Sequence, residues 1–158
     1  MDAATFQSEA LQYERLLYRV SWSMLGNKED CNDAVQDALM RAWQKRDSLR
    51  NLQAFRPWLM RILVNTCNDM LRKHKHIQFV PVEEAQIGYE PNLTPVPFRE
   101  AMQTLSPQQR TVAMLFYLEG YPIKDIADML AIPIGTVKSR LMYARKRLQI
   151  QLSEEWEG

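Results

Sequence analysis

A proline-bearing segment in the middle of the chain, residues 77–98, sets the strongest limit on how this sequence can fold. It holds four prolines at irregular spacing and one glycine: Pro81, Gly88, Pro91, Pro95 and Pro97. Proline lacks a backbone N–H and fixes φ, so such a run cannot lie inside a helix. The charged residues of the segment are all acidic: Glu83, Glu84 and Glu90. We therefore expect an extended acidic linker between two structural units, residues 1–76 and 99–158.

Helical periodicity dominates on both sides of this linker, and the alternation typical of strands is nearly absent. In the first unit, apolar residues recur at spacings of three and four: Phe6, Ala10, Tyr13, Leu17, Val20 and Met24. This stripe predicts one helix, which Gly26 can end in the left-handed conformation. A second predicted helix ends near Lys45 and carries Cys31, Val35, Ala38, Leu39 and Ala42. A third begins near Ala54, with Pro57 in its first turn, where a missing N–H costs little.

The second unit opens with a short predicted helix at residues 99–104. Ser106, Pro107 and Gln109 then form a strong helix start, because this order allows a capping box with proline at the first helical position. That helix is expected to run to Leu118 and to stop at Gly120. We predict an all-α chain of two small helical domains, each marginal alone and suited to docking on something larger.

The clearest functional motif is a pair of predicted helices, residues 123–130 and 134–149, joined by a tight turn. This is the spacing of a helix-turn-helix. The second helix has no acidic residue but five basic ones: Lys138, Arg140, Arg145, Lys146 and Arg147. The net charge of the chain is only +1, so this local concentration of charge is what points to the major groove of DNA. The alternative is an ordinary amphipathic helix with a solvated basic face.

Three stretches of the chain carry a resemblance to one family. The first is the C-terminal stretch, residues 105–145, which contains Gly135-Thr136-Val137-Lys138-Ser139-Arg140-Leu141. The others are residues 29–43, with Asp33-Ala34-Val35-Gln36-Asp37, and residues 55–66, with Val64-Asn65-Thr66. They resemble region 4, region 2.2 and regions 2.3 and 2.4 of sigma-70 proteins, in family order. Because no large domain intervenes, the chain is most similar to the extracytoplasmic-function (ECF) group.

The resemblance implies a binding subunit that redirects bacterial core RNA polymerase, with no catalysis and no cofactor of its own. Residues 1–76 would bind the polymerase clamp and read the minus-10 promoter element as a melted single strand. Residues 99–158 would read the minus-35 element as duplex. The linker, residues 77–98, would thread through the polymerase near the RNA exit path. The resemblance also implies an anti-sigma protein as a further partner.

Residue roles are carried over position by position from the family. Bases of the minus-35 element would be faced by Lys138, Ser139, Met142 and Tyr143. The DNA backbone there would be touched by Thr136, Arg140, Arg145, Lys146 and Arg147. A loop that pockets a flipped minus-10 base would contain Leu49, Arg50 and Asn51. The same strand would be held by Asn65 and attracted by Arg61, Arg72, Lys73 and Lys75. The polymerase clamp would be met by Asp33, Gln36, Asp37 and Arg41.

Several of these positions have plainer interpretations. Asn65 can hydrogen-bond its own helix, and the basic run at residues 72–76 can be a solvated helix end favoured by the helix dipole. Trp43 and Trp58 are expected in the core or on a domain face, rather than as base-stacking platforms. The sequence also departs from the family, because Pro122 and Pro133 stand where capping Ser or Thr is common. Leu49 replaces an aromatic residue of some relatives, so the base preference of the loop stays open.

The two cysteines, Cys31 and Cys67, fall at apolar helical positions and are expected to be buried free thiols. A metal site built from Cys67, His74 and His76 matches no common zinc spacing and lacks a fourth ligand. No apolar run approaches the roughly 20 residues that span a bilayer, and no signal peptide is recognisable, so we expect a cytoplasmic protein.

Two other functions remain open at this point. A repressor or activator could use the helix-turn-helix alone, but it would not need the pattern at residues 33–43 that resembles a polymerase-binding helix. An enzyme with a DNA-binding tail is disfavoured, because the sequence shows no nucleotide-binding loop, metal cluster or nucleophile motif.

Overall fold

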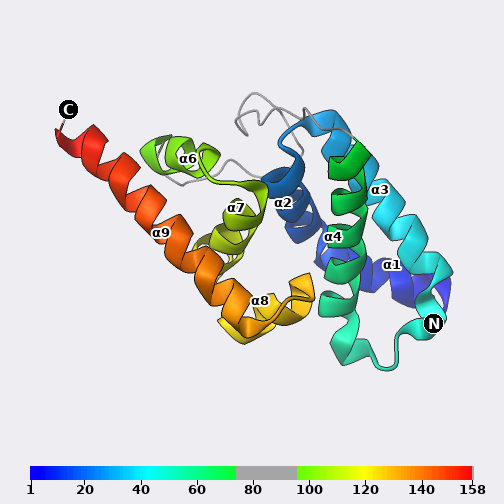
Figure 1. The fold of residues 1–158 in the computed structure, drawn as a ribbon. Coiled ribbons are helices and arrows are strands. Elements are labelled where there is room, and N and C mark those ends of the chain that lie inside the picture. The colour runs from blue at the N-terminus through cyan, green and yellow to red at the C-terminus, as the bar shows by residue number, and fades with distance from the viewer. Residues whose placement is uncertain (74–95, 158) are drawn as a thin grey trace.

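The computed structural model describes residues 1–73 and 96–157, and the regular structure in these two ranges is entirely helical. The first range contains α1 (Ala3–Gln12), α2 (Glu14–Leu25), α3 (Lys28–Gln44) and α4 (Phe55–Lys73). Two short 3-10 turns, η1 (Arg46–Ser48) and η2 (Leu52–Ala54), connect α3 to α4. The second range contains α6 (Val96–Gln103), α7 (Pro107–Ala113), the π-helical η3 (Met114–Leu118), α8 (Ile123–Leu130) and α9 (Ile134–Glu157). The predicted all-α fold is confirmed (Figure 1).

The prediction of a single first helix was wrong, because the chain breaks at Tyr13 into α1 and α2. Tyr13 leaves helical geometry, yet its carbonyl already accepts the first hydrogen bond of α2, from Leu17 N at 2.8 Å. The break lets α1 bring Phe6 onto two rings, with centroids 5.3 Å from Trp43 and 5.9 Å from Phe55. A break of one residue preserves the apolar stripe, so periodicity alone could not reveal it.

Helices α2, α3 and α4 pack together and form the core of the first half. Gly26 ends α2 with φ of 76°, as predicted, and Asn27 caps α3 by accepting a hydrogen bond from Asp30 N at 2.9 Å. The fully buried side chains are mostly aliphatic and include Leu17, Val20, Leu25, Val35, Leu59 and Leu63. Cys31 and Cys67 lie among them as buried free thiols, which confirms that prediction.

The first helix of the second half begins earlier, and its last helix ends later, than predicted. Helix α6 starts at Val96, so the last residues assigned to the linker are helical. Pro97 is the second residue of this helix, where a backbone N–H would have no acceptor within the helix. The missing N–H of proline therefore costs little at this position. Residues 77–95 of the predicted linker lie outside the described ranges. Helix α9 runs to Glu157 instead of stopping near residue 149, since residues 150–157 contain neither glycine nor proline.

The predicted start of α7 is confirmed in detail. Gln109 N donates to Ser106 Oγ at 3.2 Å, and Ser106 N donates to Gln109 Oε1 at 3.4 Å, which completes the capping box. The helix continues as η3 and stops before Gly120, whose φ of 73° suits glycine. The capping box and the glycine stop depend on residues close together in the sequence, so both could be predicted without knowledge of the fold.

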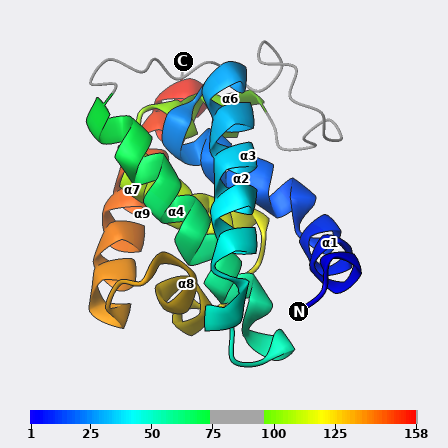
Figure 2. The same cartoon turned by 90° about the vertical axis from the view of Figure 1, so that its right-hand side faces the viewer.

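The two halves lie against each other rather than apart. Helix α8 packs on α4 and α7 packs on α2, as Figures 1 and 2 show from two directions. Buried side chains from both halves belong to one continuous cluster. Among the described helices, none is long and apolar enough to cross a membrane. This packing places the C-terminal helix-turn-helix beside the face of α4 that carries the predicted single-strand site.

Candidate nucleic-acid interface

The helix-turn-helix consists of α8, a three-residue turn and α9. Its helices are held together by the buried side chains of Ile126, Met129, Val137 and Leu141. The turn begins at Ala131, which adopts the left-handed conformation with φ of 56° without being a glycine. Its neighbour Ile132 donates its N–H to Ala127 O at 3.1 Å, which satisfies an exposed helix end. The turn therefore fixes the direction in which α9 leaves α8.

The first three turns of α9 present the side chains predicted to face duplex bases. All four are exposed: Lys138, Ser139, Met142 and Tyr143. Tyr143 is 56 % exposed and Met142 is 48 % exposed, although both are large and apolar enough to be buried in a core. Ser139 Oγ donates to Gly135 O at 3.0 Å within the helix. Such a surface offers one cation, the hydroxyls of Ser139 and Tyr143, and two apolar groups to an edge of DNA.

The residues predicted to touch the DNA backbone flank this face. Arg145, Lys146 and Arg147 are exposed, whereas Thr136 and Arg140 are half-buried. Arg145 Nε donates to the hydroxyl of Tyr117 at 3.1 Å, so η3 orients this guanidinium. Sequence reasoning missed Tyr117, because the contact joins residues 28 positions apart and no local pattern signals it.

Proline stands at the two positions where the helices of this motif begin. Pro122 is the N-cap of α8 and makes no side-chain cap. At the start of α9, Thr136 N and Val137 N both donate to Pro133 O, at 3.0 and 3.2 Å. The fold thus tolerates the departure from Ser or Thr noted in the sequence, as expected for residues that preset φ.

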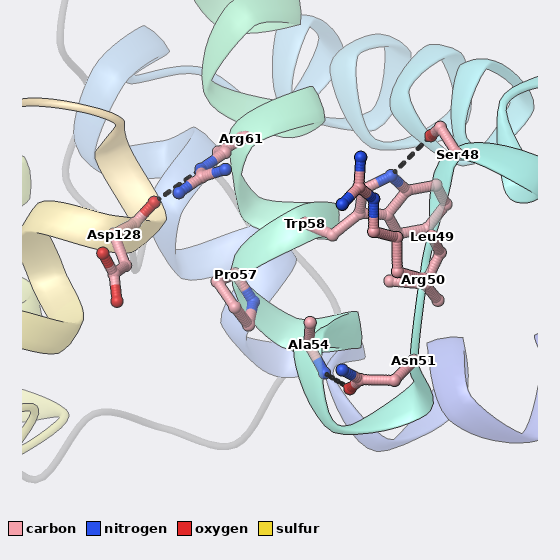
Figure 3. Close-up of a pocket in the computed structure, with 9 residues that line it drawn as sticks. All are labelled: Ser48, Leu49, Arg50, Asn51, Ala54, Pro57, Trp58, Arg61 and Asp128. Atoms are coloured by element: carbon pink, nitrogen blue, oxygen red, sulfur yellow. Dashed lines mark hydrogen bonds between the residues drawn. The ribbon is translucent and has the colours of Figure 1, made fainter.

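A second candidate site is a pocket of about 410 Å³ between the α3–α4 connection and the start of α4 (Figure 3). Its lining contains four residues predicted for the minus-10 strand: Leu49, Arg50, Asn51 and Arg61. Ser48, Ala54, Pro57, Trp58 and Asp128 complete it. The sequence-predicted loop residues are therefore brought together, and they share the pocket with a residue of α8.

Trp58 was expected on a domain face and is found half-buried in the wall of this pocket. Its Nε1 donates to Ser48 Oγ at 3.0 Å, and its ring packs 5.6 Å from that of Phe55. These contacts fix the ring while leaving part of it open to the pocket, as Figure 3 shows. Trp43 is held differently, between Phe6 and the guanidinium of Arg46, which lies 3.9 Å from its ring centroid.

The other predicted minus-10 residues continue along one side of α4. Asn65 is exposed one turn beyond Arg61, and Arg72 and Lys73 are exposed at the end of the helix. At 1.5 Å per residue, Arg72 lies about 16 Å along the axis from Arg61, so it cannot belong to the pocket. Asn51 Oδ1 accepts a hydrogen bond from Ala54 N at 3.1 Å and caps η2. The additional predicted residue Lys75, with His74 and His76, lies outside the described ranges.

Helix α8 approaches this face of α4 from the other half of the chain. Arg61 Nε donates to Asp128 O at 2.8 Å. Arg56 forms an ion pair with Asp125 at 3.3 Å and stacks over Tyr121, with 4.6 Å between its guanidinium carbon and the ring centroid. Two arginines beside the pocket are thus already engaged by acceptors from α8.

A third candidate surface lies on α3, on residues that belong neither to the α9 face nor to the α4 pocket. Asp33, Gln36 and Asp37 are exposed there on one helical face, as predicted. Met40 belongs to the same face at helical spacing and is 61 % exposed, a feature that sequence reasoning missed. A large exposed apolar side chain among polar ones is typical of a docking surface.

Arg41, the fourth residue predicted for this surface, is half-buried and bridges two helices. It pairs with Asp37 and with Asp69 of α4, each at 3.1 Å. Hydrogen bonds from Arg41, and then from Arg72, lower the pKa of Asp69. Arg41 therefore positions α3 against α4 in addition to lying at the edge of the surface.

Comparison with known protein families follows this division of the chain. Residues 10–77 match the family model for sigma-70 region 2. Residues 96–148 match the model for sigma-70 region 4. The first match contains the α3 surface and the pocket residues from Ser48 to Arg61. The second contains Asp128 of the pocket, with α8, the turn and α9 as far as residue 148.

Individual proteins show the same likeness over nearly the full chain. RNA polymerase sigma factor SigV of Bacillus subtilis is 31% identical over 87% of this chain and 85% of its own length. ECF RNA polymerase sigma factor SigM of Mycobacterium tuberculosis is 34% identical over 93% of this chain and 76% of its own. The sigma factor RpoE of Bartonella quintana, solved in complex with the anti-sigma factor NepR, superposes with a TM-score of 0.72 at 31% identity. That match covers 94% of this chain and 97% of RpoE.

Proposed function

This chain belongs to the ECF group of the sigma-70 family and acts in promoter-specific transcription initiation; from that premise we propose how its surfaces divide the work. The proposal assigns duplex reading to α9, single-strand reading to the α4 pocket and polymerase binding to α3. The domain limits proposed are residues 1–76 and 96–158, with the second limit moved from residue 99 because α6 begins at Val96. The observation that carries the proposal is the exposed face of Lys138, Ser139, Met142 and Tyr143 at the start of α9.

The duplex site would read the minus-35 element in the major groove. Lys138 can donate to base acceptors, and Met142 and Tyr143 can contact apolar base edges such as the thymine methyl group. Arg145, held by Tyr117, would meet phosphate together with Lys146 and Arg147. Thr136 and Arg140 lie at the half-buried edge of the face and would contribute further backbone contacts.

The single-strand site would hold one flipped base of the minus-10 element in the α4 pocket. Trp58 supplies an aromatic surface that its bond to Ser48 holds in place, and stacking on such a surface favours unpaired bases. Leu49, Arg50 and Asn51, which line the same pocket, would contribute further contacts. Asn65, Arg72 and Lys73 would follow the strand along α4, which suits a polyanion running parallel to the helix.

The α3 surface would dock on the core enzyme. Asp33, Gln36 and Asp37 would provide polar contacts around the exposed Met40, with Arg41 at the edge. An apolar centre within a polar rim is the usual anatomy of a protein interface. We infer that the chain is a non-catalytic specificity subunit, and that chemistry is supplied by the polymerase.

Two further assignments follow from the relatives. RpoE of Bartonella quintana was solved with an anti-sigma factor, which supports a protein of that kind as a partner of this chain. CnrH, also solved with a partner, shares 21% identity, and its TM-score of 0.69 supports the fold alone. Since core polymerase and promoter DNA would be its working partners, we place the chain in the cytoplasm.

Reconstituted transcription tests this function directly. Core RNA polymerase is incubated with a library of promoter fragments, alone or with the purified chain, and the transcripts are sequenced. The proposal expects initiation at a defined subset of promoters sharing two elements, well above core enzyme alone. If the chain adds no promoter-specific initiation, the proposed division of labour is wrong.

A further inference from the structure

The hydrogen bond between Arg145 and Tyr117 joins α9 to a rare backbone conformation. Tyr117 lies in η3, where the N–H of Glu119 donates to Met114 O at 3.0 Å, five residues back, so this turn is π-helical. Well under about 1% of residues in globular proteins are π-helical, and single π-helical turns are frequent at functional sites. The wider turn changes the direction of the side chains that follow Met114 relative to a continuous α-helix, and Tyr117 is one of them.

Tyr117 is supported from one side while its other side stays open to solvent. Its ring meets that of Phe116 edge-on, with ring centroids 5.1 Å apart and an angle of 88° between the planes. The first two residues of the turn, Met114 and Leu115, are buried and anchor η3 in the core. Tyr117 itself is 40 % exposed. The turn therefore holds the tyrosine ring in place and carries its hydroxyl to the surface beside α9.

The contact with α9 uses only part of the hydrogen-bonding capacity of each side chain. Arg145 Nε donates to Tyr117 Oη at 3.1 Å, which occupies one lone pair of the hydroxyl. Within the described ranges, the hydroxyl hydrogen and the four N–H groups on the two Nη atoms meet no acceptor, and no carboxylate pairs with Arg145. Hydrogen-bond donors from two elements thus converge on one exposed place, and no described negative charge neutralises them. Such a place suits an anion.

The position of this donor pair fits the edge of the groove that α9 would read. Arg145 follows Lys138 by seven residues, or two helical turns, so both lie on the same side of α9 and about 10 Å apart along its axis. The major groove of B-form DNA is about 12 Å wide and is bordered by phosphates. A helix that brings Lys138 to base edges therefore brings Arg145 to the phosphates at the border of the groove.

We propose that Tyr117 and Arg145 form a single-phosphate site, in which the tyrosine hydroxyl and the guanidinium donate together to one phosphate of the minus-35 backbone. This inference rests on the proposed function and adds a DNA ligand from outside the helix-turn-helix. The hydroxyl holds the guanidinium in place before DNA arrives, so less side-chain freedom is lost on binding. Lys146 and Arg147 have no such support among the described residues. The hydroxyl also donates its own hydrogen to the phosphate, whose charge strengthens that bond.

Tyr117→Phe tests this by removing the hydroxyl while keeping the ring against Phe116, and thermal unfolding checks that the fold is retained. The chain is assembled with core polymerase, and affinity is measured for a promoter recovered in the transcription assay. Tyr117→Phe should weaken binding by about three- to tenfold, and Arg145→Ala by roughly ten- to a hundredfold. The combined variant should lose less than the product of the two losses, because the groups act as a unit. Tyr18→Phe, which removes the hydroxyl of a half-buried tyrosine on α2, is the matched control and should bind like the native chain.

A second readout separates a phosphate contact from a merely structural role. Promoter duplexes are made in which one phosphate at a time along the minus-35 element is replaced by an uncharged methylphosphonate. At one position, this replacement should remove the advantage of the native chain over both Tyr117→Phe and Arg145→Ala, since the anion that the two groups share is gone. The deficit of Arg147→Ala should disappear at a different position. A structural role for Tyr117 would instead weaken binding to every duplex by the same factor.

The outcomes distinguish this inference from the function on which it rests. Loss of both deficits at the same phosphate supports the shared site. The shared site is refuted if Tyr117→Phe binds as tightly as the native chain, or if its deficit is equal on all duplexes. It is also refuted if the deficits of Tyr117→Phe and Arg145→Ala disappear at different phosphates. In each of these cases promoter-specific initiation is retained and the proposed function stands. If the assembled enzyme shows no promoter-specific initiation, the proposed function itself fails.

Discussion

The guanidinium of Arg61 donates a hydrogen bond to the main-chain carbonyl of Asp128 at 2.8 Å, joining residues 67 positions apart. This bond links α4, which lines the proposed single-strand pocket, to α8, which supports the duplex-reading helix. The two proposed DNA sites are therefore joined by a direct contact in the packed chain. A substitution at one site can therefore affect DNA binding at the other. The two effects are distinguished by measuring duplex binding and single-strand binding separately.

Lys138→Ala should weaken use of the minus-35 element and leave polymerase binding intact. Loss of one donor to a base edge costs about 1–3 kcal/mol, or roughly five- to a hundredfold in promoter affinity. The measurement is transcription from a promoter with an intact minus-35 element and from one with that element scrambled. Lys28→Ala, at an exposed site on α3, is the matched control. A loss of polymerase binding would show that α9 was wrongly assigned.

Trp58→Ala should reduce binding of the melted minus-10 strand, because base stacking on an aromatic ring contributes about 1–3 kcal/mol. Trp58→Phe keeps an aromatic surface but removes the hydrogen bond to Ser48, so it should retain more affinity than alanine. Oligonucleotide binding to the assembled holoenzyme provides the measurement, with thermal unfolding checked in parallel. Equal affinity of the alanine and native chains would place the base elsewhere.

Met40→Ala should weaken binding to core polymerase without destabilising the free chain. The side chain is 61 % exposed, so its truncation should change the free energy of unfolding by less than about 0.5 kcal/mol. Leu11→Ala removes an equally exposed apolar side chain from α1 and serves as control. Titration of the labelled Met40→Ala and Leu11→Ala chains with core enzyme measures the dissociation constant of each. An unchanged dissociation constant for Met40→Ala would argue against α3 as the centre of the docking surface.

Stability should fall as pH rises above about 9, because burial raises the pKa of Cys31 to about 12 and also raises that of Cys67. Between the ordinary thiol pKa and the raised one, the unfolded chain has lost a proton that the native chain keeps. Unfolding is therefore favoured there, by about 2–3 kcal/mol at pH 10.5 for one thiol. Urea unfolding from pH 7 to pH 10.5 measures the slope. Cys31→Ala, less stable throughout, should show a shallower slope, and an identical slope would exclude this thiol as a cause.

Local signals in the sequence predicted much of the fold. Gly26 ends α2, Ser106 and Gln109 form the capping box, and α8 and α9 have the predicted spacing. Each of these features depends on residues only a few positions apart in the sequence. The break at Tyr13 escaped prediction, since the apolar stripe continues across it. The helical start at Val96 was hidden by prolines that suit a linker and a first helical turn equally.

The sequence predicted which residues form the candidate sites, but it did not predict the contacts between them. The resemblance located the loop at Leu49 and the face at Lys138, and the structure gathers or exposes those residues. Trp58 in the pocket wall and Tyr117 beneath Arg145 were missed, since both depend on contacts between separate elements. The packing of α8 on α4 is likewise a tertiary property that no local spacing encodes.

The packing of α7 on α2, where the hydroxyls of Ser23 and Thr111 are hydrogen-bonded at 2.8 Å, has a consequence for the order in which the chain is made. These residues are 88 positions apart, so at about 5–20 residues per second Ser23 is synthesised roughly 4–18 seconds before Thr111. During that interval the nascent first half has no α7 or α8 to cover it. The side of α4 that α8 contacts through Arg61 and Asp128 is therefore exposed during synthesis, whereas the α3 surface is exposed both then and in the finished fold.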